Sequence, residues 1–183
     1  MRADARRNRE LIVRAATRVF MDTGCSGSME DIAQAAGLGV GTLYRHFPDR
    51  AGLLALITCD VVSRLAAQVE AAAATDLPRW EVLLGYVRDA VREPLAMLKS
   101  VSTDDPVVAG PAERLHAVLG RVVEGAQAEG SLRADLETAA VTDLLGLVVC
   151  RPGARDDDPL ATVVLDGLRA PGLENRPDAI RGQ

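Results

Sequence analysis

A short stretch near the amino end carries side chains suited to contact with a nucleic-acid duplex. Tyr44, Arg45 and His46 are consecutive, Thr42 precedes them and Arg50 follows. A guanidinium can hydrogen-bond both major-groove acceptors of guanine, which makes Arg45 the candidate for direct base reading. Tyr44 and His46 suit donation to phosphate oxygens, which fixes the register of a protein on DNA without specifying sequence.

The other candidate contacts lie beside these three residues or at helix starts. Thr42 suits a base edge or a phosphate, and Val40 suits the methyl group of thymine. Arg50 and the free N–H groups of the helix that it begins are expected to bind a phosphate, and Ser28 is expected to do the same at another helix start. Each has a plainer explanation, since Ser28 is first a helix cap and single arginines are ordinarily solvated. Their joint spacing favours the functional interpretation.

The elements that position these residues are three helices, predicted from hydrophobic spacing over 8–23, 28–36 and 40–47. Ser28 and Asp31 stand three residues apart, as in a capping box. Gly37 falls between the two short helices, where a tight turn needs a positive φ that glycine adopts at low cost. Two short helices joined by a glycine turn are typical of a helix-turn-helix.

Residues 28–50, SMEDIAQAAGLGVGTLYRHFPDR, closely resemble the DNA-binding segment of tetracycline-repressor (TetR) type regulators, and GTLYRHF at 41–47 is the most specific part. The resemblance covers about residues 8–56. It implies a homodimeric, usually repressing transcription factor that binds a DNA operator and whose larger domain binds a small-molecule inducer. Three positions depart from the family's common residues: Ser28 replaces Thr, Gly39 replaces Ser or Asn, and Arg50 replaces Lys. Gly39 has no side chain with which to donate to the duplex.

The rest of the chain shows helical spacing and no period of two, so the predicted fold class is all-α. We expect a helix-turn-helix DNA-binding domain over 1–49, a helical ligand-binding and dimerisation domain over 50–170, and a loose tail over 171–183. Further helices are predicted over 50–74, about 80–98, 112–129, 136–149 and 159–169. Pro94 is expected to kink or break the second of these.

The last two predicted helices are the candidates for a dimer interface. Two helix-turn-helix units must lie about one duplex turn apart, roughly 34–36 Å, to read a palindrome. Paired with their symmetry mates, the two helices would form a four-helix bundle. The candidate interface residues are Val141, Leu144, Leu145, Val148, Leu160, Val163, Val164 and Leu168. Alternatively, these side chains only face the chain's own core.

The middle helices are expected to enclose a pocket for an effector whose identity the sequence leaves open. Its apolar candidates are Trp80, Leu84, Val87, Val91, Met97 and Leu119, and its polar candidates are Tyr86, Arg88 and His116. Ordinary core packing explains most of them equally well. A ligand that binds more tightly to a dimer with the wrong half-site spacing would weaken DNA binding by that difference in affinity. The helix over 50–74 is expected to act as the lever between the pocket and the DNA-binding helices.

The charge distribution fits a chain that touches nucleic acid with one end only. The 183 residues carry a net charge of −5, made of +2 over residues 1–50 and −7 over the remainder. A basic end on an acidic body favours a single nucleic-acid module. Arg6 and Arg7 are expected to extend over the backbone or into the minor groove, although a solvated, arginine-rich helix explains the charge as well.

Other classes of function find little support. Three distant cysteines and two histidines suit neither a disulfide framework nor a metal site, so no metal or cofactor is expected. The chain lacks the Gly-x-Ser-x-Gly and His-Glu-x-x-His patterns, so an enzyme is not expected. No stretch approaches the ~20 apolar residues of a membrane span and no secretory core opens the chain, which favours the cytoplasm. A helical interaction module without DNA binding and a small helical enzyme remain the alternatives.

Overall fold

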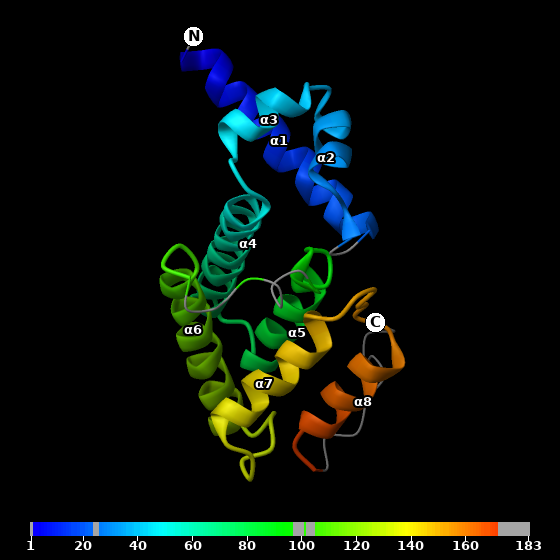
Figure 1. Ribbon diagram of the computed structural model, residues 1–183. Coiled ribbons are helices and arrows are strands. Elements are labelled where there is room, and N and C mark those ends of the chain that lie inside the picture. The colour runs from blue at the N-terminus through cyan, green and yellow to red at the C-terminus, as the bar shows by residue number, and fades with distance from the viewer. Residues whose placement is uncertain (1, 24–25, 97–100, 102–104, 172–183) are drawn as a thin grey trace, which may run out of the picture.

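The computed structural model describes residues 2–23, 26–96, 101 and 105–171, and over these ranges the chain forms eight helices and no strand. The all-α fold class predicted from the sequence is confirmed. The helices are α1 (Arg2–Thr23), α2 (Met29–Ala36), α3 (Val40–His46), α4 (Arg50–Ala73), α5 (Arg79–Ala90), α6 (Ala109–Ala128), α7 (Thr138–Val149) and α8 (Pro159–Leu168). Helices α1 to α3, the reading head, stand on a body made of α4 to α8 (Figure 1).

The reading head is built around a few completely buried side chains. α1 packs on α2, and α2 packs on α3. Ile12, Ile32 and Leu43 come one from each helix and are fully buried, and Leu53 at the start of α4 is buried with them. A unit this small buries little apolar surface alone, so it depends on its contact with α4.

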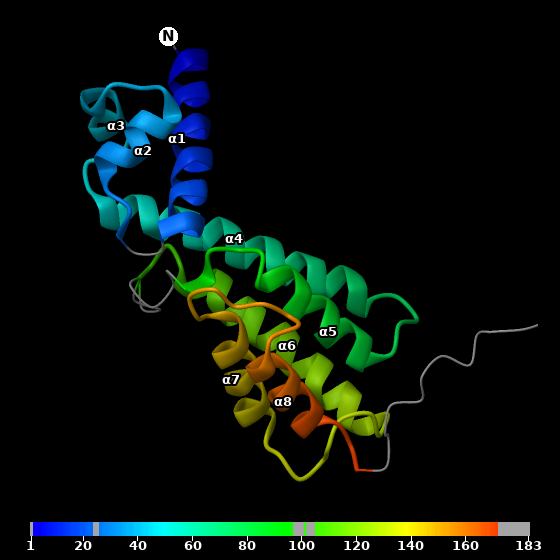
Figure 2. The ribbon, with the colours of Figure 1, turned by 90° about the vertical axis from the view of Figure 1, so that its right-hand side faces the viewer.

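α4 is the element shared by the reading head and the body. Asp49 caps it by accepting a hydrogen bond from the Gly52 N–H at 2.7 Å. Its 24 residues span about 36 Å at ~1.5 Å per residue, and it runs from beneath the reading head along the length of the body (Figure 2). By length and composition α4 could cross a membrane, but 56% of its apolar window is buried inside the protein, as in a core helix.

The body helices differ from the prediction at several ends. α5 stops at Ala90, and residues 91–96 do not continue it, so the helix ends before Pro94 rather than kinking there. Residues 97 and 98 of the predicted helix lie outside the described residues. The N-cap of α5 is Pro78, and the Thr75 hydroxyl before it donates to the Ala72 carbonyl of α4 at 2.7 Å. α1 begins six residues earlier than predicted, since its arginines and alanines are good helix formers.

α8 is the outermost helix, and its end is fastened to the α6–α7 connection. Leu132 and Arg169 form an antiparallel bridge. The Arg133 N–H donates to the Leu168 carbonyl at 3.1 Å, and the Ala170 N–H donates to the Ser131 carbonyl at 3.2 Å. These bonds fix the carboxyl end of α8 although the helix itself packs mainly on α7. The predicted tail lies outside the described residues, except residue 171.

Candidate nucleic-acid interface

The turn between α2 and α3 has the geometry that its glycine predicts. Gly37 has φ 67° and ends α2 in the left-handed region. Its N–H donates to the Gln34 carbonyl at 3.0 Å, and the Leu38 N–H donates to the Ala33 carbonyl at 3.0 Å. Residues with a Cβ are strained in this conformation. The turn therefore fixes the angle at which α3 leaves α2.

α3 buries one face and exposes the other. Leu43 is fully buried against the reading head, whereas Val40 is 37% exposed and Tyr44 is 42% exposed. Arg45 is also exposed, and Thr42 and His46 are half-buried. Val40 and Tyr44 are four residues apart and so lie on one side of the helix, and Arg45, the residue after Tyr44, is exposed next to them. Gly39 is the N-cap of α3, and the cap has no side-chain hydrogen bond.

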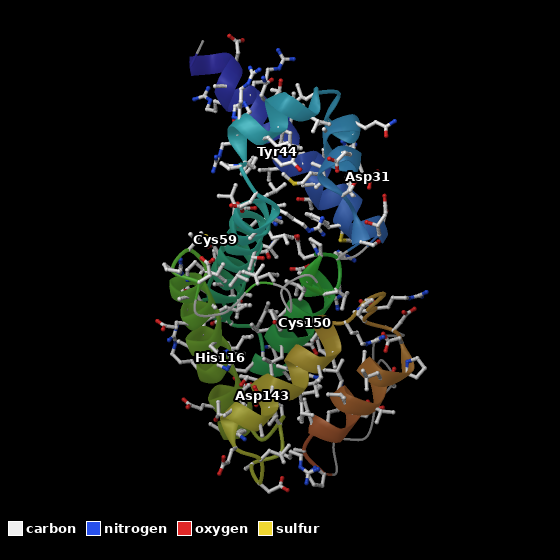
Figure 3. All side chains as sticks on the ribbon, in the orientation of Figure 1. Asp31, Tyr44, Cys59, His116, Asp143 and Cys150 are labelled. Carbon is white, nitrogen blue, oxygen red and sulfur yellow. The ribbon has the colours of Figure 1, made fainter. Side chains whose placement is uncertain are left out.

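Ser28 forms the predicted capping box with Asp31. The Asp31 N–H donates to the Ser28 hydroxyl oxygen at 3.0 Å, and the Ser28 N–H and hydroxyl donate to the Asp31 carboxylate at 2.9 and 2.6 Å. Figure 3 labels Asp31 on α2 and Tyr44 on α3. Hydrogen bonds from the Ser28 side chain, and then from its backbone, lower the pKa of Asp31.

Arg50 is half-buried, and its side chain has partners within the protein. Its guanidinium donates to the Gly27 carbonyl and lies over the Phe20 ring, 4.9 Å from the ring centroid. The first turn of the helix that Arg50 begins is already capped by the Asp49 carboxylate. The structure therefore directs this guanidinium toward the interior of the reading head.

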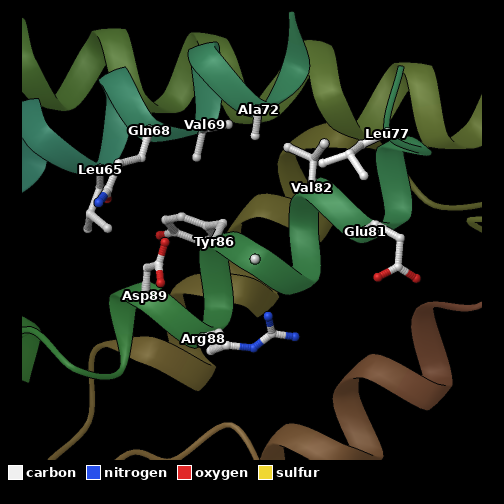
Figure 4. Close-up of a pocket in the computed structure, with 11 residues that line it drawn as sticks. Leu65, Gln68, Val69, Ala72, Leu77, Glu81, Val82, Tyr86, Arg88 and Asp89 are labelled. Atoms are coloured by element: carbon white, nitrogen blue, oxygen red, sulfur yellow. The ribbon is translucent and has the colours of Figure 1, made fainter. Parts of the chain in front are cut away.

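A cavity of about 300 Å³ lies in the body between α4 and α5. Tyr86 and Val82 on α5 face Val69 and Ala72 on α4 across it (Figure 4). Its lining residues are Leu65, Gln68, Val69, Ala72, Leu77, Glu81, Val82, Gly85, Tyr86, Arg88 and Asp89. The wall is mainly apolar, and Gln68, Glu81 and Asp89 add polar groups. Burial raises the pKa of the Tyr86 hydroxyl, because a phenolate would be poorly solvated there.

Only Tyr86 and Arg88 of the predicted pocket residues line this cavity. The others lie elsewhere. The Trp80 ring centroid lies 5.1 Å from the Arg169 guanidinium, and Leu84, Val87 and Leu119 pack in the core. Val91 lines a second cavity beside the reading head, and His116 is exposed, with its Nε2 3.5 Å from the Thr142 hydroxyl. Met97 falls outside the described residues. Sequence reasoning missed the α4 lining because it treated that helix only as a lever.

The predicted dimer residues divide between two sides of α7 and α8. Val141, Leu145, Val148 and Leu168 are at most 1% exposed within a single protomer, so they pack in its core, which is the alternative that the sequence left open. The outward apolar side chains are Leu147 at 58%, Leu160 at 42% and Val163 at 69%, with Leu144 and Val164 half-buried beside the core. Leu147 was missed because α7 is apolar on nearly every side.

Comparisons with known proteins give a family match at the amino end and a structural match over most of the chain. The sequence model of bacterial regulatory proteins of the tetR family matches residues 12–57. HTH-type transcriptional regulators from Staphylococcus aureus are 46% identical over 54 residues, which cover 29% of this chain and 29% of theirs. A TetR transcriptional regulator from Streptomyces coelicolor is 30% identical, with a TM-score of 0.62 over 89% of this chain and 99% of that structure.

The chain belongs to the TetR family. A TetR regulator from Mycobacterium vanbaalenii gives the same result, with 30% identity and a TM-score of 0.62 over 92% of this chain and 99% of that one. The TetR protein described here is thus a DNA-binding transcriptional regulator with an amino-terminal helix-turn-helix. The chain matches less than a third of the length of these Staphylococcus relatives. Within the described part of the chain, no cluster of metal-ligating side chains occurs.

Proposed function

We propose that this regulator is a cytoplasmic repressor that binds a palindromic operator as a homodimer and is released by a small-molecule effector. The observation that supports it best is the division of α3 into two faces. Leu43 anchors the helix in the core, while Val40, Tyr44 and Arg45 stand exposed on its other side. A helix held in this way can enter the major groove with its outer side chains free to contact the duplex.

The exposed side chains have distinct proposed roles. Arg45 reads a guanine through two hydrogen bonds, and Val40 contacts a thymine methyl group. Tyr44 and His46 donate to phosphates, and Thr42 contacts a base edge or a phosphate. Gly39 and Ser28 lie at the starts of α3 and α2, where backbone and hydroxyl groups approach the DNA backbone. The Arg50 guanidinium, which already has partners within the reading head, is considered separately below.

The second copy is proposed to pack on the outward apolar side of α7 and α8. Leu147, Leu160 and Val163 are exposed, and Leu144 and Val164 on the same two helices are half-buried against the core. Such a patch is unusual on a monomer and is typical of an interface. Two helices from each copy give the four-helix bundle that a twofold dimer needs.

The effector is proposed to bind in the cavity between α4 and α5. The same α4 that supplies Leu65, Gln68 and Val69 to the cavity begins beneath the reading head. An effector that binds better when α4 is displaced would favour a dimer whose two α3 helices do not match the operator. An effector bound in the cavity is therefore expected to change the distance between the two α3 helices.

Selection of bound duplexes from a random pool tests the proposal directly, and enrichment of a palindrome is the expected result. Arg45→Ala should then lose ~1–3 kcal/mol of binding free energy and relax the preference at one base position. Arg92→Ala, which removes an exposed arginine of the body, is the matched control and should leave binding unchanged. Equal loss on all duplexes would make Arg45 a phosphate contact, and failure to enrich any palindrome would contradict the proposed function.

A further inference from the structure

Both phenylalanines of the chain carry an arginine over their ring. The Arg9 guanidinium of α1 lies 4.8 Å from the ring centroid of Phe47, just after α3. The Arg50 guanidinium of α4 lies 4.9 Å from the ring centroid of Phe20, near the end of α1. Cations stack favourably on aromatic faces, more strongly where water is partly excluded. These two contacts join helices that are distant in sequence.

The Gly27 backbone, which Arg50 also contacts, is packed so closely that a larger residue would require its neighbours to shift. A Cβ at Gly27 would lie 2.5 Å from the Val19 side chain and 2.8 Å from the Thr23 hydroxyl. The Ser26 hydroxyl donates to the Thr23 carbonyl at 2.7 Å, which holds the same segment against α1. The Gly27 carbonyl then accepts from the Arg50 guanidinium. The connection to α2 is thus held between α1 and α4.

The residue after Gly27 is Ser28, the cap of α2. Any displacement of Gly27 therefore moves the capping box, then α2, and through the Gly37 turn the recognition helix α3. Lysine could not replace Arg50 in this arrangement, because a planar guanidinium stacks on a ring while donating from its edge. An ammonium group can donate to a carbonyl or approach a ring, but its compact charge has no planar face and edge with which to do both at once.

We infer that Arg50 is a positioning residue: it joins Gly27, in the α1–α2 connection, to Phe20 of α1 so that α3 is presented correctly, and it makes no phosphate contact. The inference rests on the proposed function, since its effect is read as operator affinity. It places Arg50 at the junction where α4 meets the reading head. Movement of α4 therefore reaches α2 and α3 through this side chain.

The test compares Arg50→Lys and Arg50→Ala with the wild-type homodimer on the selected palindrome, by fluorescence anisotropy between 50 and 200 mM salt. Positioning predicts that both variants lose affinity by on the order of tenfold with an unchanged slope of log affinity against log salt. Arg14→Lys, an exchange at an exposed position of α1, is the control and should bind as the wild type does. A phosphate contact would instead be rescued by lysine, and alanine would reduce the slope by about 0.9 per lost contact, or about 1.8 per dimer. That result would overturn the inference.

Phe20→Leu keeps the inference falsifiable if the Arg50 variants fold poorly. It removes the ring and leaves the arginine charge, so positioning predicts weaker binding with the wild-type salt slope. Unchanged affinity in Phe20→Leu would overturn the inference. If the wild type binds no duplex, the proposed function fails by itself. Hydrogen exchange then still tests whether Arg50 holds the Gly27 segment in place: amides over residues 26–31 should exchange faster in Arg50→Lys than in Arg14→Lys. Equal exchange in the two variants would overturn the inference on that measurement.

Discussion

The reading head and the body of this TetR regulator are stabilised in different ways. The reading head is small, and specific local features connect its helices. These are a capping box at Ser28, a glycine in the left-handed region at Gly37, and arginines stacked on its two phenylalanines. The body is a larger bundle whose core is almost entirely aliphatic. A small unit buries little apolar surface, so the contacts that connect its helices matter more for its stability. A large bundle is stabilised by its core and can vary its surface freely.

The same contrast accounts for the pattern of similarity. The outer face of the reading head must fit a duplex of fixed dimensions while its inner face stays packed, so both faces of α3 are constrained. The tetR family model matches residues 12–57, at this end of the chain. The solved TetR regulator from Streptomyces coelicolor shares the fold at 30% identity over 89% of this chain. The helices of the body need only pack against one another and enclose a cavity.

The largest expected effects come from the body, and they distinguish its core from its outward face. Leu145→Ala empties a fully buried site and should lower the free energy of unfolding by about 2–5 kcal/mol. Val163→Asp changes a side chain that is 69% exposed and should leave the protomer folded while separating the dimer. Urea unfolding and sedimentation velocity measure the two outcomes.

The converse result would reverse the assignment of the two faces. If Leu145→Ala dissociated the protein without loss of stability, or if Val163→Asp remained a dimer, the outward side of α7 and α8 would not be the interface. Asp143→Asn changes another exposed residue of α7 and serves as the control, with no expected change in either measurement.

A smaller effect is expected in the reading head, where two glycines give opposite signs. Gly37→Ala places a Cβ at φ 67° and should destabilise the protein by about 1–2 kcal/mol. Gly41→Ala lies inside α3 and should stabilise it by about 0.5–1 kcal/mol. A Cβ at either position meets no atom within 4 Å, so the difference reports the backbone alone. Equal melting temperatures would show that the turn does not require its left-handed residue.

The features of the reading head that the sequence predicted correctly are local ones. Ser28 and Asp31 lie three residues apart, and Gly37 follows α2 directly, so neighbouring positions reveal both the cap and the turn. The partner of Arg50 is 23 residues away in sequence, at Gly27, and no local pattern indicates it. The predicted phosphate role of Arg50 came from its position at a helix start, where only the fold shows which way the guanidinium turns.

The sequence predicted that the body is all-helical, but not which side of each helix faces the core. α7 carries Val141 and Leu145 toward the core and Leu147 toward solvent, and the spacing of its apolar residues allows either choice. The cavity depended in the same way on tertiary packing. It lies between α4 and α5, and its polar Gln68 and Asp89 carry no sequence signal that distinguishes them from surface residues.

The smallest expected effect concerns the capping box, which can be tested through the pKa of Asp31. Ser28→Ala should cost about 1 kcal/mol of stability, and Ser28→Thr should restore it because the hydroxyl is kept. Hydrogen bonds from Ser28 hold the pKa of Asp31 below its ordinary 3.8. Their stabilisation is therefore complete above that value and is lost as pH falls through the lower, folded pKa. In Ser28→Ala the pKa of Asp31 should rise toward 3.8, as carboxyl-carbon NMR titration would measure.

The body supplies the contrast for this titration. The pKa of Asp157 is also lowered, by hydrogen bonds from the exposed Arg155. Arg155→Ala should raise the pKa of Asp157 with little change in unfolding free energy, because exposed ion pairs contribute little. If Ser28→Ala changed stability as little as Arg155→Ala does, the capping box would be no more important than a surface pair. The reading head would then owe its geometry to the Gly37 turn and the arginine–phenylalanine contacts alone.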